Sequence, residues 1–511
     1  MKNMIIGQLI ALLFVLAGCE DADPYFNRSV VNLTGTVATK THLVMVDYAH
    51  NRALMLGLTE QNIGKVESVP VPSAPLYAEK RMNSDETLIL SAGTPGNKDM
   101  AEQPAALTRL QSNGKKITYS LGSKPFDTLV ASPDGRYVIL MRRILSNFVL
   151  ENMNEIAIVD MTVPPQNASA VIFKTLSGRP GEVFFSENFS IEGQARSIVA
   201  ISSQGALFIL DSSHFERQET TVYLGQNNDL IVVPNQVIFD SASPRLYVRA
   251  NNADDIFSLR LTSRTVAENK NDFSTSIDII GVGGTATDMS LYHENGNGYL
   301  FVMAAASGKC AIVNVATGRT FSLNLPEGLN RAYLFERGTG SATSRHALLY
   351  QDYIDGYYIL DFAGLEEDGE RNLHFMGATG QSQNETYPAK VDDRVLIMHH
   401  KGLTLLDLEN ERFAQYTSRY NLTHAHLDST IRRFWVAPEN SQQVAYLDMN
   451  DGSTGELIID SAVHNVIPAW EAGKLIIEHS HPLGYVTIID VSEPNRDNAV
   501  SVKGFLFNDV L

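Results

Sequence analysis

Short runs of apolar and β-branched residues alternate with clusters of Asp, Gly, Ser, Asn and Pro along most of the chain. An amphipathic helix would repeat its apolar residues at intervals of three and four positions, and this spacing is almost absent. Strand-length apolar runs bounded by turn residues are typical of β-strands. The pattern therefore predicts an all-β domain over residues 41–511, preceded by a polar segment.

One phrase recurs along this domain: four apolar or β-prone residues followed by an acidic residue. Where its copies are consecutive, the closing acids lie 51, 46, 41 and 42 residues apart. Asn314 occupies the same position after the run 311–313. The six closing acids are Asp160, Asp211, Asp361, Asp407, Asp448 and Asp490.

A second phrase alternates with the first and consists of a polar turn followed by another β-type run. Nine such turns are found, near residues 83, 132, 187, 240, 294, 338, 391, 428 and 471. The repeat length of about 37 to 55 residues brackets that of four-stranded propeller blades. The run Tyr137–Met141 is apolar throughout, which is typical of a strand covered on both faces. The sequence therefore predicts four-stranded antiparallel blades that pack radially around an axis.

The segment from Ser132 to Val138, with the sequence SPDGRYV, resembles the strand-turn-strand corner of YVTN-type and WD40-like propeller repeats. The run Arg245–Asn251 resembles a second copy further along the chain. The resemblance covers most of residues 42–504 and is to a class of repeats. It implies a single β-propeller whose ligands bind near the central channel.

The ends of the domain suggest how the ring closes. Residues 42–71 align with the second, third and fourth strands of a blade, so we expect the C-terminal segment Phe505–Leu511 to supply its innermost strand. The nine turns and this composite unit make ten repeats, whereas propellers typically have four to eight blades. We therefore expect one ring of seven or eight blades, with the extra units as insertions; an unusually large ring and two small rings are the alternatives.

The N-terminus has the features of a cleaved export signal. Lys2 precedes an apolar run, Met4–Ala17, which is too short for a comfortable membrane span of about 20 residues. The sequence Leu-Ala-Gly-Cys that ends at Cys19 resembles the lipobox of bacterial lipoproteins, in which the cysteine becomes the acylated first residue. This resemblance implies a signal peptide over residues 1–18, a lipidated tether over residues 19–40 and attachment to a membrane of the cell envelope. An ordinary signal peptide and an uncleaved helix are the alternatives.

Glu20 follows the cysteine, where an Asp would resemble an inner-membrane retention signal, so outer-membrane sorting is favoured. The body would face either the periplasm or the outside of the cell. The formal charge of the chain is −18, and removal of Lys2 with the signal makes it −19. Such an acidic body argues against nucleic acid as a partner. The second cysteine, Cys310, lies in a predicted strand, so we expect a buried and unreactive thiol.

Histidines are concentrated late in the chain, where seven of the thirteen lie within residues 399–481. The strand alignment directs all seven toward one face of three neighbouring blades. Neutral imidazoles that converge bind zinc, copper or manganese, or act as acid and base. The alternative is hydrogen bonding between loops without a ligand. The seven are His399, His400, His424, His426, His464, His479 and His481, and the candidate ligands of a divalent metal are His424, His426, His479 and His481.

Three arginines from other blades, Arg142, Arg143 and Arg249, are expected on the same face, where guanidinium groups would suit carboxylates of an acidic sugar or of a partner protein. A solvated, salt-bridged rim is the alternative. The six closing acids recur once per blade, so we interpret them as caps of the following turn and not as a calcium or catalytic site.

These observations support two functions. The first is a membrane-anchored envelope lipoprotein whose propeller binds a protein or an envelope polymer, with no certain cofactor. The second is an envelope enzyme, a metal-assisted hydrolase or polysaccharide lyase that uses the histidines. A role in outer-membrane assembly rests on architecture alone. The sequence leaves the catalytic residues, the partner and the substrate undetermined.

Overall fold

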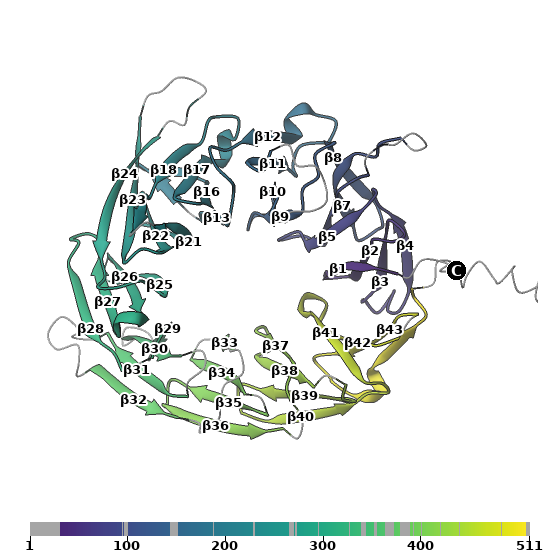
Figure 1. Cartoon of the computed structure of the whole chain (residues 1–511). Coiled ribbons are helices and arrows are strands. Elements are labelled where there is room, and N and C mark those ends of the chain that lie inside the picture. Colours follow the sequence, from purple (N-terminus) through teal and green to yellow (C-terminus); the bar gives the residue numbers. More distant parts are fainter. Residues whose placement is uncertain are drawn as a thin grey trace, which may run out of the picture.

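The computed structural model describes residues 31–506, except for residues 95, 97–100, 144–151, 188, 228–229, 265–269, 271–272, 295, 327, 339–343, 352–354, 363–371, 379–388, 392, 400, 419–420, 439 and 482. The described chain forms ten four-stranded antiparallel sheets arranged as blades around one ring (Figure 1). The predicted all-β propeller is therefore confirmed, and the prediction of seven or eight blades is wrong. All ten repeats counted in the sequence are blades, and none is an insertion.

The blades follow the chain in order, and within each blade the strands run from the centre of the ring outward. Blades 1 to 5 contain β1 (Leu33–Ala38), β2 (His42–Asp47), β3 (Arg52–Gly57) and β4 (Val66–Pro70); β5 (Pro75–Lys80), β6 (Glu86–Ser91), β7 (Ala105–Gln111) and β8 (Lys116–Gly122); β9 (Thr128–Ala131), β10 (Tyr137–Met141), β11 (Glu155–Asp160) and β12 (Val171–Thr175); β13 (Val183–Phe185), β16 (Ile198–Ser203), β17 (Ala206–Asp211) and β18 (Thr220–Tyr223); and β21 (Val233–Phe239), β22 (Arg245–Asn251), β23 (Asp255–Ser263) and β24 (Phe273–Gly281).

The second half of the ring repeats this pattern. Blades 6 to 10 contain β25 (Asp288–Glu294), β26 (Asn297–Ala304), β27 (Lys309–Asn314) and β28 (Thr320–Asn324); β29 (Arg331–Arg337), β30 (Ser344–Tyr350), β31 (Tyr357–Asp361) and β32 (Leu373–Gly377); β33 (Ala389–Val391), β34 (Arg394–His399), β35 (Gly402–Asp407) and β36 (Arg412–Thr417); β37 (His424–Asp428), β38 (Arg433–Ala437), β39 (Gln443–Asp448) and β40 (Thr454–Ile458); and β41 (Val463–Ala469), β42 (Lys474–His479), β43 (Tyr485–Asp490) and β44 (Val500–Lys503).

Two short hairpins and several single-turn helices lie in the connections. The hairpins are β14 (Phe189–Ile191) with β15 (Gln194–Arg196), and β19 (Gln226–Asn227) with β20 (Leu230–Ile231); the 3₁₀ turns are η1 (Ala168–Ala170), η2 (Ser212–His214), η3 (Ala305–Ser307), η6 (Trp470–Ala472) and η7 (Arg496–Asn498). Among the described residues, no helix is long and apolar enough to cross a membrane.

Ten clusters of buried side chains hold the ring together, and each cluster lies between two neighbouring blades. Alternate residues of a central strand serve opposite neighbours: Ile139 packs toward blade 4, whereas Val138 and Leu140 pack toward blade 2. A strand with apolar residues on both faces is stable only when both faces are covered. Each blade therefore depends on both of its neighbours, and the apolar run Tyr137–Met141 is buried on both sides as predicted.

The ring closes without the predicted exchange of strands. β1 is the innermost strand of the first blade and pairs with β2, so the composite blade built from the C-terminus is wrong. The propeller begins at Leu33, within the segment assigned from the sequence to the tether. Closure depends on an apolar core that joins blades 1 and 10, in which Phe505 packs with Leu43 and Leu54.

Five of the six closing acids have the capping role predicted for them. The Asp160 carboxylate accepts a hydrogen bond from the Thr162 backbone N–H at 2.9 Å, and Asp211, Asp407, Asp448 and Asp490 accept equivalent bonds from residues two or three positions further on. These acids also pair with a basic residue at or near the start of the adjacent second strand. The pairs are Arg136–Asp160, Arg196–Asp211, Arg394–Asp407, Arg433–Asp448 and Lys474–Asp490.

Arginine side chains join neighbouring blades by donating to the backbone carbonyl of the residue that follows a closing acid. Arg109 donates to the carbonyl oxygen of Met161 at 2.7 Å, and Met161 directly follows a closing acid of the next blade. Arg433 donates to the Val491 carbonyl at 2.6 Å, and Arg337 donates to the Leu408 carbonyl, so the contact recurs at three blade interfaces. A guanidinium group that reaches a backbone carbonyl fixes the offset between sheets as well as their distance.

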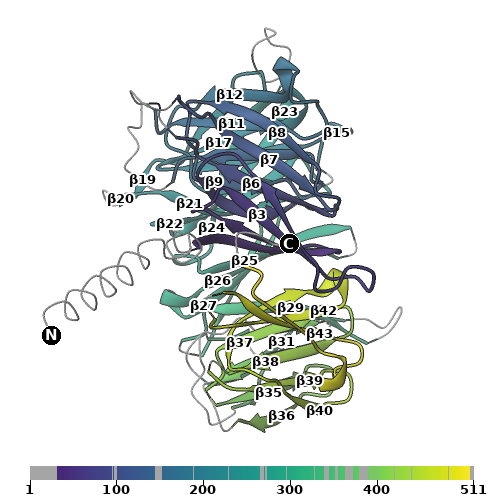
Figure 2. The same ribbon diagram turned by 90° about the vertical axis from the view of Figure 1, so that its right-hand side faces the viewer.

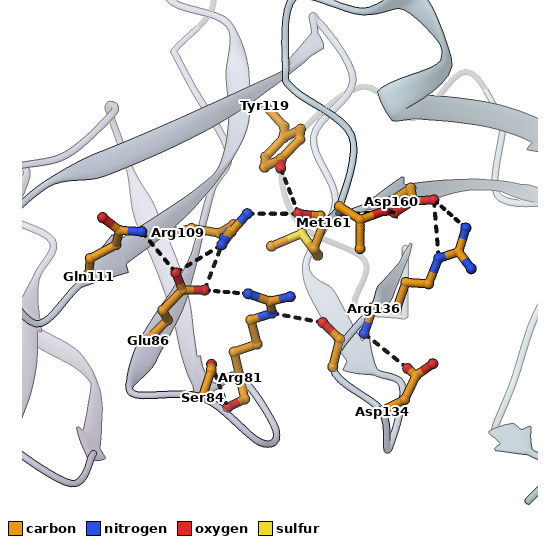
Figure 3. Close-up of polar contacts among 12 residues, drawn as sticks. Arg81, Ser84, Glu86, Arg109, Gln111, Tyr119, Asp134, Arg136, Asp160 and Met161 are labelled. Atoms are coloured by element: carbon orange, nitrogen blue, oxygen red, sulfur yellow. Dashed lines mark hydrogen bonds and ion pairs between the residues drawn. The ribbon is translucent and has the colours of Figure 1, made fainter.

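Figure 3 shows this contact between blades 2 and 3. Glu86 accepts two hydrogen bonds from Arg109, at 2.8 and 3.0 Å, and one from Arg81 at 2.6 Å. Arg81 in turn donates to the Gly135 carbonyl of the adjacent blade at 2.7 Å. Gly135 has φ of +69°, and a Cβ there would lie 2.4 Å from the Met82 carbonyl oxygen. The predicted SPDG corner is therefore a tight turn held against the turn of the preceding blade.

Candidate functional site

Each blade presents its loops on two faces of the ring. In all ten sheets the beginning of the innermost strand lies beside the end of the second strand, as with Leu33 and Asp47 in blade 1. We call this side the start face. It contains the loops that lead into innermost strands and those that follow second strands, and it is the face on which the histidines and arginines were expected. The chain enters the ring at this face.

His399 and His479 occupy equivalent positions at the ends of the second strands β34 and β42, and both are buried. The Nε2 of His399 lies 2.7 Å from the Thr404 hydroxyl, and the Nε2 of His479 lies 2.8 Å from the Thr487 hydroxyl. The Nδ1 of His479 is 2.8 Å from the Ala462 carbonyl oxygen. Burial lowers the pKa of His479, and its bond to that carbonyl opposes the shift. These two imidazoles join strands within a blade.

His424 and His426 project from the innermost strand β37. Burial lowers the pKa of His426, the nearby His424 lowers it further, and a hydrogen bond to the Val466 backbone opposes the shift. His426 thus bonds to the innermost strand of the next blade. His464 and His481 are exposed. His400 lies outside the described residues.

The described histidines therefore share a face, as the strand alignment predicted, but their rings are used in different ways. No group of three or more His, Cys, Asp or Glu side chains is placed to hold a metal ion within the described part of the chain. Among the predicted metal ligands, His479 has a protein hydrogen-bond partner at each ring nitrogen. The geometry of these residues thus gives no support to a histidine metal centre.

The three arginines also make contacts within the protein. Arg142 is 4% exposed; it donates to the carbonyls of Pro125 and Asn152 at 2.8 and 2.6 Å, and its guanidinium lies over the Phe126 ring. These bonds join the end of β10 to Pro125, before β9, and to Asn152, before β11, so this side chain is structural. Cys310 is likewise fully buried as predicted, and burial raises its thiol pKa to about 12.

Arg143 and Arg249 are half-buried. Arg143 joins blade 3 to the connection before β13, through the Gly181 carbonyl at 2.6 Å and the Glu182 carboxylate at 3.0 Å. Arg249 donates to the Gln236 side chain at 2.8 Å, and its pKa is lowered by burial, which Asp288 opposes. These contacts correspond to the salt-bridged rim that was the alternative interpretation.

A groove that the sequence pattern did not predict lies between blades 8 and 9, with a volume of about 770 Å³. We call it the blade 8/9 groove. It follows the outer part of the ring between β36 and the paired strands β39 and β40. Its lining residues are Gly402, Leu403, Gln415, Tyr416, Thr417, Ser418, Leu422, Val436, Pro438, Gln443, Ala445, Tyr446, Leu447, Thr454, Gly455 and Glu456.

The floor of the groove is the outer end of an interblade core. Leu403, Leu422, Val436 and Leu447 belong to the core that joins blades 8 and 9, and Tyr416 packs against it. The Tyr416 hydroxyl donates to the Gly452 carbonyl oxygen at 3.0 Å, which ties the end of β36 to a turn of blade 9. Burial raises the pKa of Tyr416, and the nearby Asp451 raises it further. The aromatic ring is therefore held in place before any ligand arrives.

Strand register assigns polar side chains to the blade 9 wall. Residues directly opposite in an antiparallel pair lie on the same face of the sheet. Glu456 pairs with Ala445 and Thr454 pairs with Leu447, and Leu447 faces blade 8. Gln443 lies two positions before Ala445, so its side chain is on the same face. This wall therefore presents an amide, a hydroxyl and a carboxylate above the apolar floor.

Charge is sparse in the groove. Among its described lining residues Glu456 is the one charged side chain, and none is basic. Inspection of the sequence could not reveal this site, because its residues belong to two blades and are individually ordinary strand residues. Its existence depends on how far the outer parts of two sheets diverge.

Comparisons with known proteins identify no family. No family model matches the chain, and no curated protein matches it. Similar solved structures include the dihydro-heme d1 dehydrogenase NirN in complex with DHE, with 12% identity over 70% of this chain and 71% of that chain and a TM-score of 0.40. They also include apo AztD from Citrobacter koseri, with 10% identity over 83% and 96% of the two chains and a TM-score of 0.36. At these values the similarities carry no argument about the function of this chain.

Proposed function

We propose that the protein is a binding platform of the bacterial cell envelope, anchored to a membrane through a lipidated Cys19. The observation that carries the proposal is the blade 8/9 groove, whose preformed walls converge on an apolar floor. Its volume lies within the range of roughly 300–1,000 Å³ that is typical of ligand sites. A rigid ring with a preformed groove is suited to holding a partner.

The contacts of the predicted site residues favour binding over catalysis. His399 and His479 join strands within their own blades, and Arg142 bonds to a backbone carbonyl within blade 3, all through buried hydrogen bonds. A catalytic imidazole needs a free nitrogen directed at a substrate position. The metal-assisted hydrolase or lyase that the sequence left open is therefore not proposed.

The tether limits where a partner is held. Cys19 and the lipobox lie outside the described residues, so lipidation, outer-membrane sorting and an envelope location rest on the sequence. Fourteen positions separate Cys19 from Leu33, so an extended tether would reach about 50 Å at most. Because the chain enters β1 at the start face, that face would be oriented toward the membrane. The binding partner, a protein or an envelope polymer, would then be held close to the membrane surface.

Two measurements test this proposal. Mass spectrometry of the mature protein should find an acylated N-terminal Cys19, and a Cys19→Ser variant should be released from membranes. Crosslinking in intact cells, followed by purification of the protein, should recover a defined protein or polymer in repeated experiments. A mature protein that retains residues 1–18, or one that yields no crosslinked partner, would contradict the corresponding half of the proposal.

A further inference from the structure

We propose that the blade 8/9 groove binds a neutral oligosaccharide. The inference rests on the proposed binding function and specifies the chemistry of the ligand. The floor is apolar: Leu403, Leu422 and Val436 belong to one core, and Tyr416 packs against it. The rim is polar, with Gln443, Thr454 and Glu456 on one wall. Pyranose rings combine an apolar face with a hydroxylated edge and match both surfaces at once.

The hydrogen-bonding groups of the rim suit hydroxyl groups. The Gln443 amide donates and accepts, the Thr454 hydroxyl does both, and the Glu456 carboxylate accepts two or more bonds. A sugar hydroxyl also donates and accepts, so it can satisfy each of these groups. Bonds to the Glu456 carboxylate are stronger than neutral ones because they are charge-assisted.

The charge of the described lining residues disfavours anionic ligands. Recognition of phosphate or carboxylate uses Arg or Lys side chains. None of the described lining residues is basic, and Glu456 would repel an anion. Phosphorylated sugars and polymers of uronic acids are therefore poor ligands for this groove, and a neutral sugar chain meets no repulsion.

The orientation of the walls argues against a peptide. Extended peptides commonly bind by adding a strand to an exposed sheet edge, where unpaired backbone groups provide hydrogen bonds. The floor of the groove lies between the facing surfaces of two sheets, where the backbone groups of β39 pair with β38 and β40; the unpaired edges of the outermost strands β36 and β40 border the groove but do not form its floor. A peptide on the floor would leave its own buried N–H and C=O groups without such partners, which costs free energy.

The fixed position of Tyr416 supports stacking of a sugar ring. Its hydroxyl is bonded to Gly452, so the aromatic ring does not need to be ordered when a ligand binds. Preorganised groups lose less conformational entropy on binding and contribute more to affinity. Ile458 follows Glu456 on the same face of β40 and is 56% exposed, which extends the apolar surface beyond the groove.

The test uses the full chain purified in detergent and four probes: chitotetraose, cellotetraose, tetragalacturonate and tetra-alanine. Binding is measured by isothermal titration calorimetry and by saturation-transfer NMR at millimolar probe concentrations. At least one of the two neutral tetrasaccharides should bind, and it should bind more tightly than the acidic sugar and the peptide. No binding of either neutral sugar, or preference for the acidic sugar or the peptide, would overturn the proposal.

Three variants locate the binding. Thr454→Trp fills the groove from an exposed position, so it should preserve folding and reduce affinity at least tenfold. Gln443→Ala should reduce affinity about fivefold, the loss that corresponds to one hydrogen bond of about 1 kcal/mol. Gln442→Ala is the matched control because Gln442 is the adjacent exposed residue, bonded to the Asp460 carbonyl oxygen, and it should bind normally. Equal affinity of Thr454→Trp and the wild type would exclude this groove.

Crosslinking in intact cells separates this inference from the proposed function. If the Thr454→Trp variant loses sugar binding and still recovers a protein partner, the platform function stands and the groove is a separate sugar site. If the wild type recovers a partner while no neutral sugar binds the groove, the inference fails and the platform function survives. If the wild type recovers no crosslinked partner in cells while sugar binding to the groove is confirmed on the purified protein, the platform function fails and the inference stands.

Discussion

Arg52 and Leu506 are separated by 454 positions in the sequence, and the Arg52 guanidinium donates a hydrogen bond to the Leu506 carbonyl oxygen at 3.2 Å. The same guanidinium donates to Asp47 at 3.0 Å, so one side chain ties the first blade to the segment after the last strand. Figure 2 shows the first and last blades side by side. The ring is thus closed by side chains and not by a shared sheet.

Phe505 provides a direct test of this closure. Its side chain is 5% exposed within the core between blades 1 and 10. Phe505→Ala should lower the free energy of unfolding by about 3–5 kcal/mol, the cost of a large core truncation. Chemical denaturation measures this loss, and hydrogen exchange should locate the earliest opening in β1 to β4 and β41 to β44. Leu483→Ala, at a more exposed position on the neighbouring loop, should have a small effect. A small effect of Phe505→Ala would mean that this core does not close the ring.

Glu86 should make stability depend on acid pH. Burial raises its pKa, but hydrogen bonds from Arg109 and Arg81 outweigh burial and lower the pKa from 4.5 to about 2. Since the folded pKa is below the unfolded one, the stabilisation is present above about pH 4.5 and is lost as the pH falls toward about 2. Glu86→Gln should cost roughly 1–3 kcal/mol at neutral pH, because two arginines lose their charged partner.

Denaturation of both proteins over a range of pH checks this expectation. The stability difference between wild type and Glu86→Gln should be constant near neutrality and should shrink below about pH 4.5. Glu471→Gln is a suitable control, since Glu471 is an exposed partner of Lys80. A difference that stays constant down to about pH 2 would show that the ionised Glu86 carboxylate is not what stabilises the interface.

His479 should make stability depend on pH in a higher range than Glu86 does. Burial lowers its pKa below the ordinary value of 6.5, and the nearby Lys503 lowers it too, while the Ala462 carbonyl, Asp460 and Glu478 oppose the shift. The unfolded chain therefore binds a proton first, so stability that is full above about pH 6.5 decreases as the pH falls. His479→Gln should weaken this dependence, measured as the change in thermal midpoint between about pH 7.5 and about pH 5.5. His481→Gln, at an exposed site, should retain it.

Removal of divalent metals tests the histidine interpretation. If the start-face histidines act as hydrogen-bonding residues of the blades and hold no metal, treatment with EDTA should leave the thermal midpoint and the far-UV circular dichroism spectrum unchanged. A His424→Ala, His479→Ala double variant should then lose stability without losing a bound metal, as measured by elemental analysis. A stoichiometric metal that disappears in this variant would restore the metal-enzyme hypothesis.

The site was only partly predictable from sequence, for a physical reason. The repeat alone was enough to place His399 and His479 at the ends of second strands, and the structure has them there. Whether an imidazole faces a ligand or a neighbouring threonine depends on interatomic distances that a repeat does not specify. The blade 8/9 groove escaped notice because Gln443 and Thr454 acquire a common role only when two blades lie side by side.

The sequence by itself determined the repeat, the strand-turn-strand corners, the capping role of Asp160 and its equivalents, and even the count of ten units, because all of these follow from local alternation and turn chemistry. Only the tertiary structure decided that all ten units enter one ring. Blade number depends on the angle between neighbouring sheets, which the packed volumes of side chains such as Ile139 and Phe505 set collectively. The same packing decided that β1 completes the first blade, since the pairing of Leu33 with Asp47 is a contact between strands and not a property of either segment.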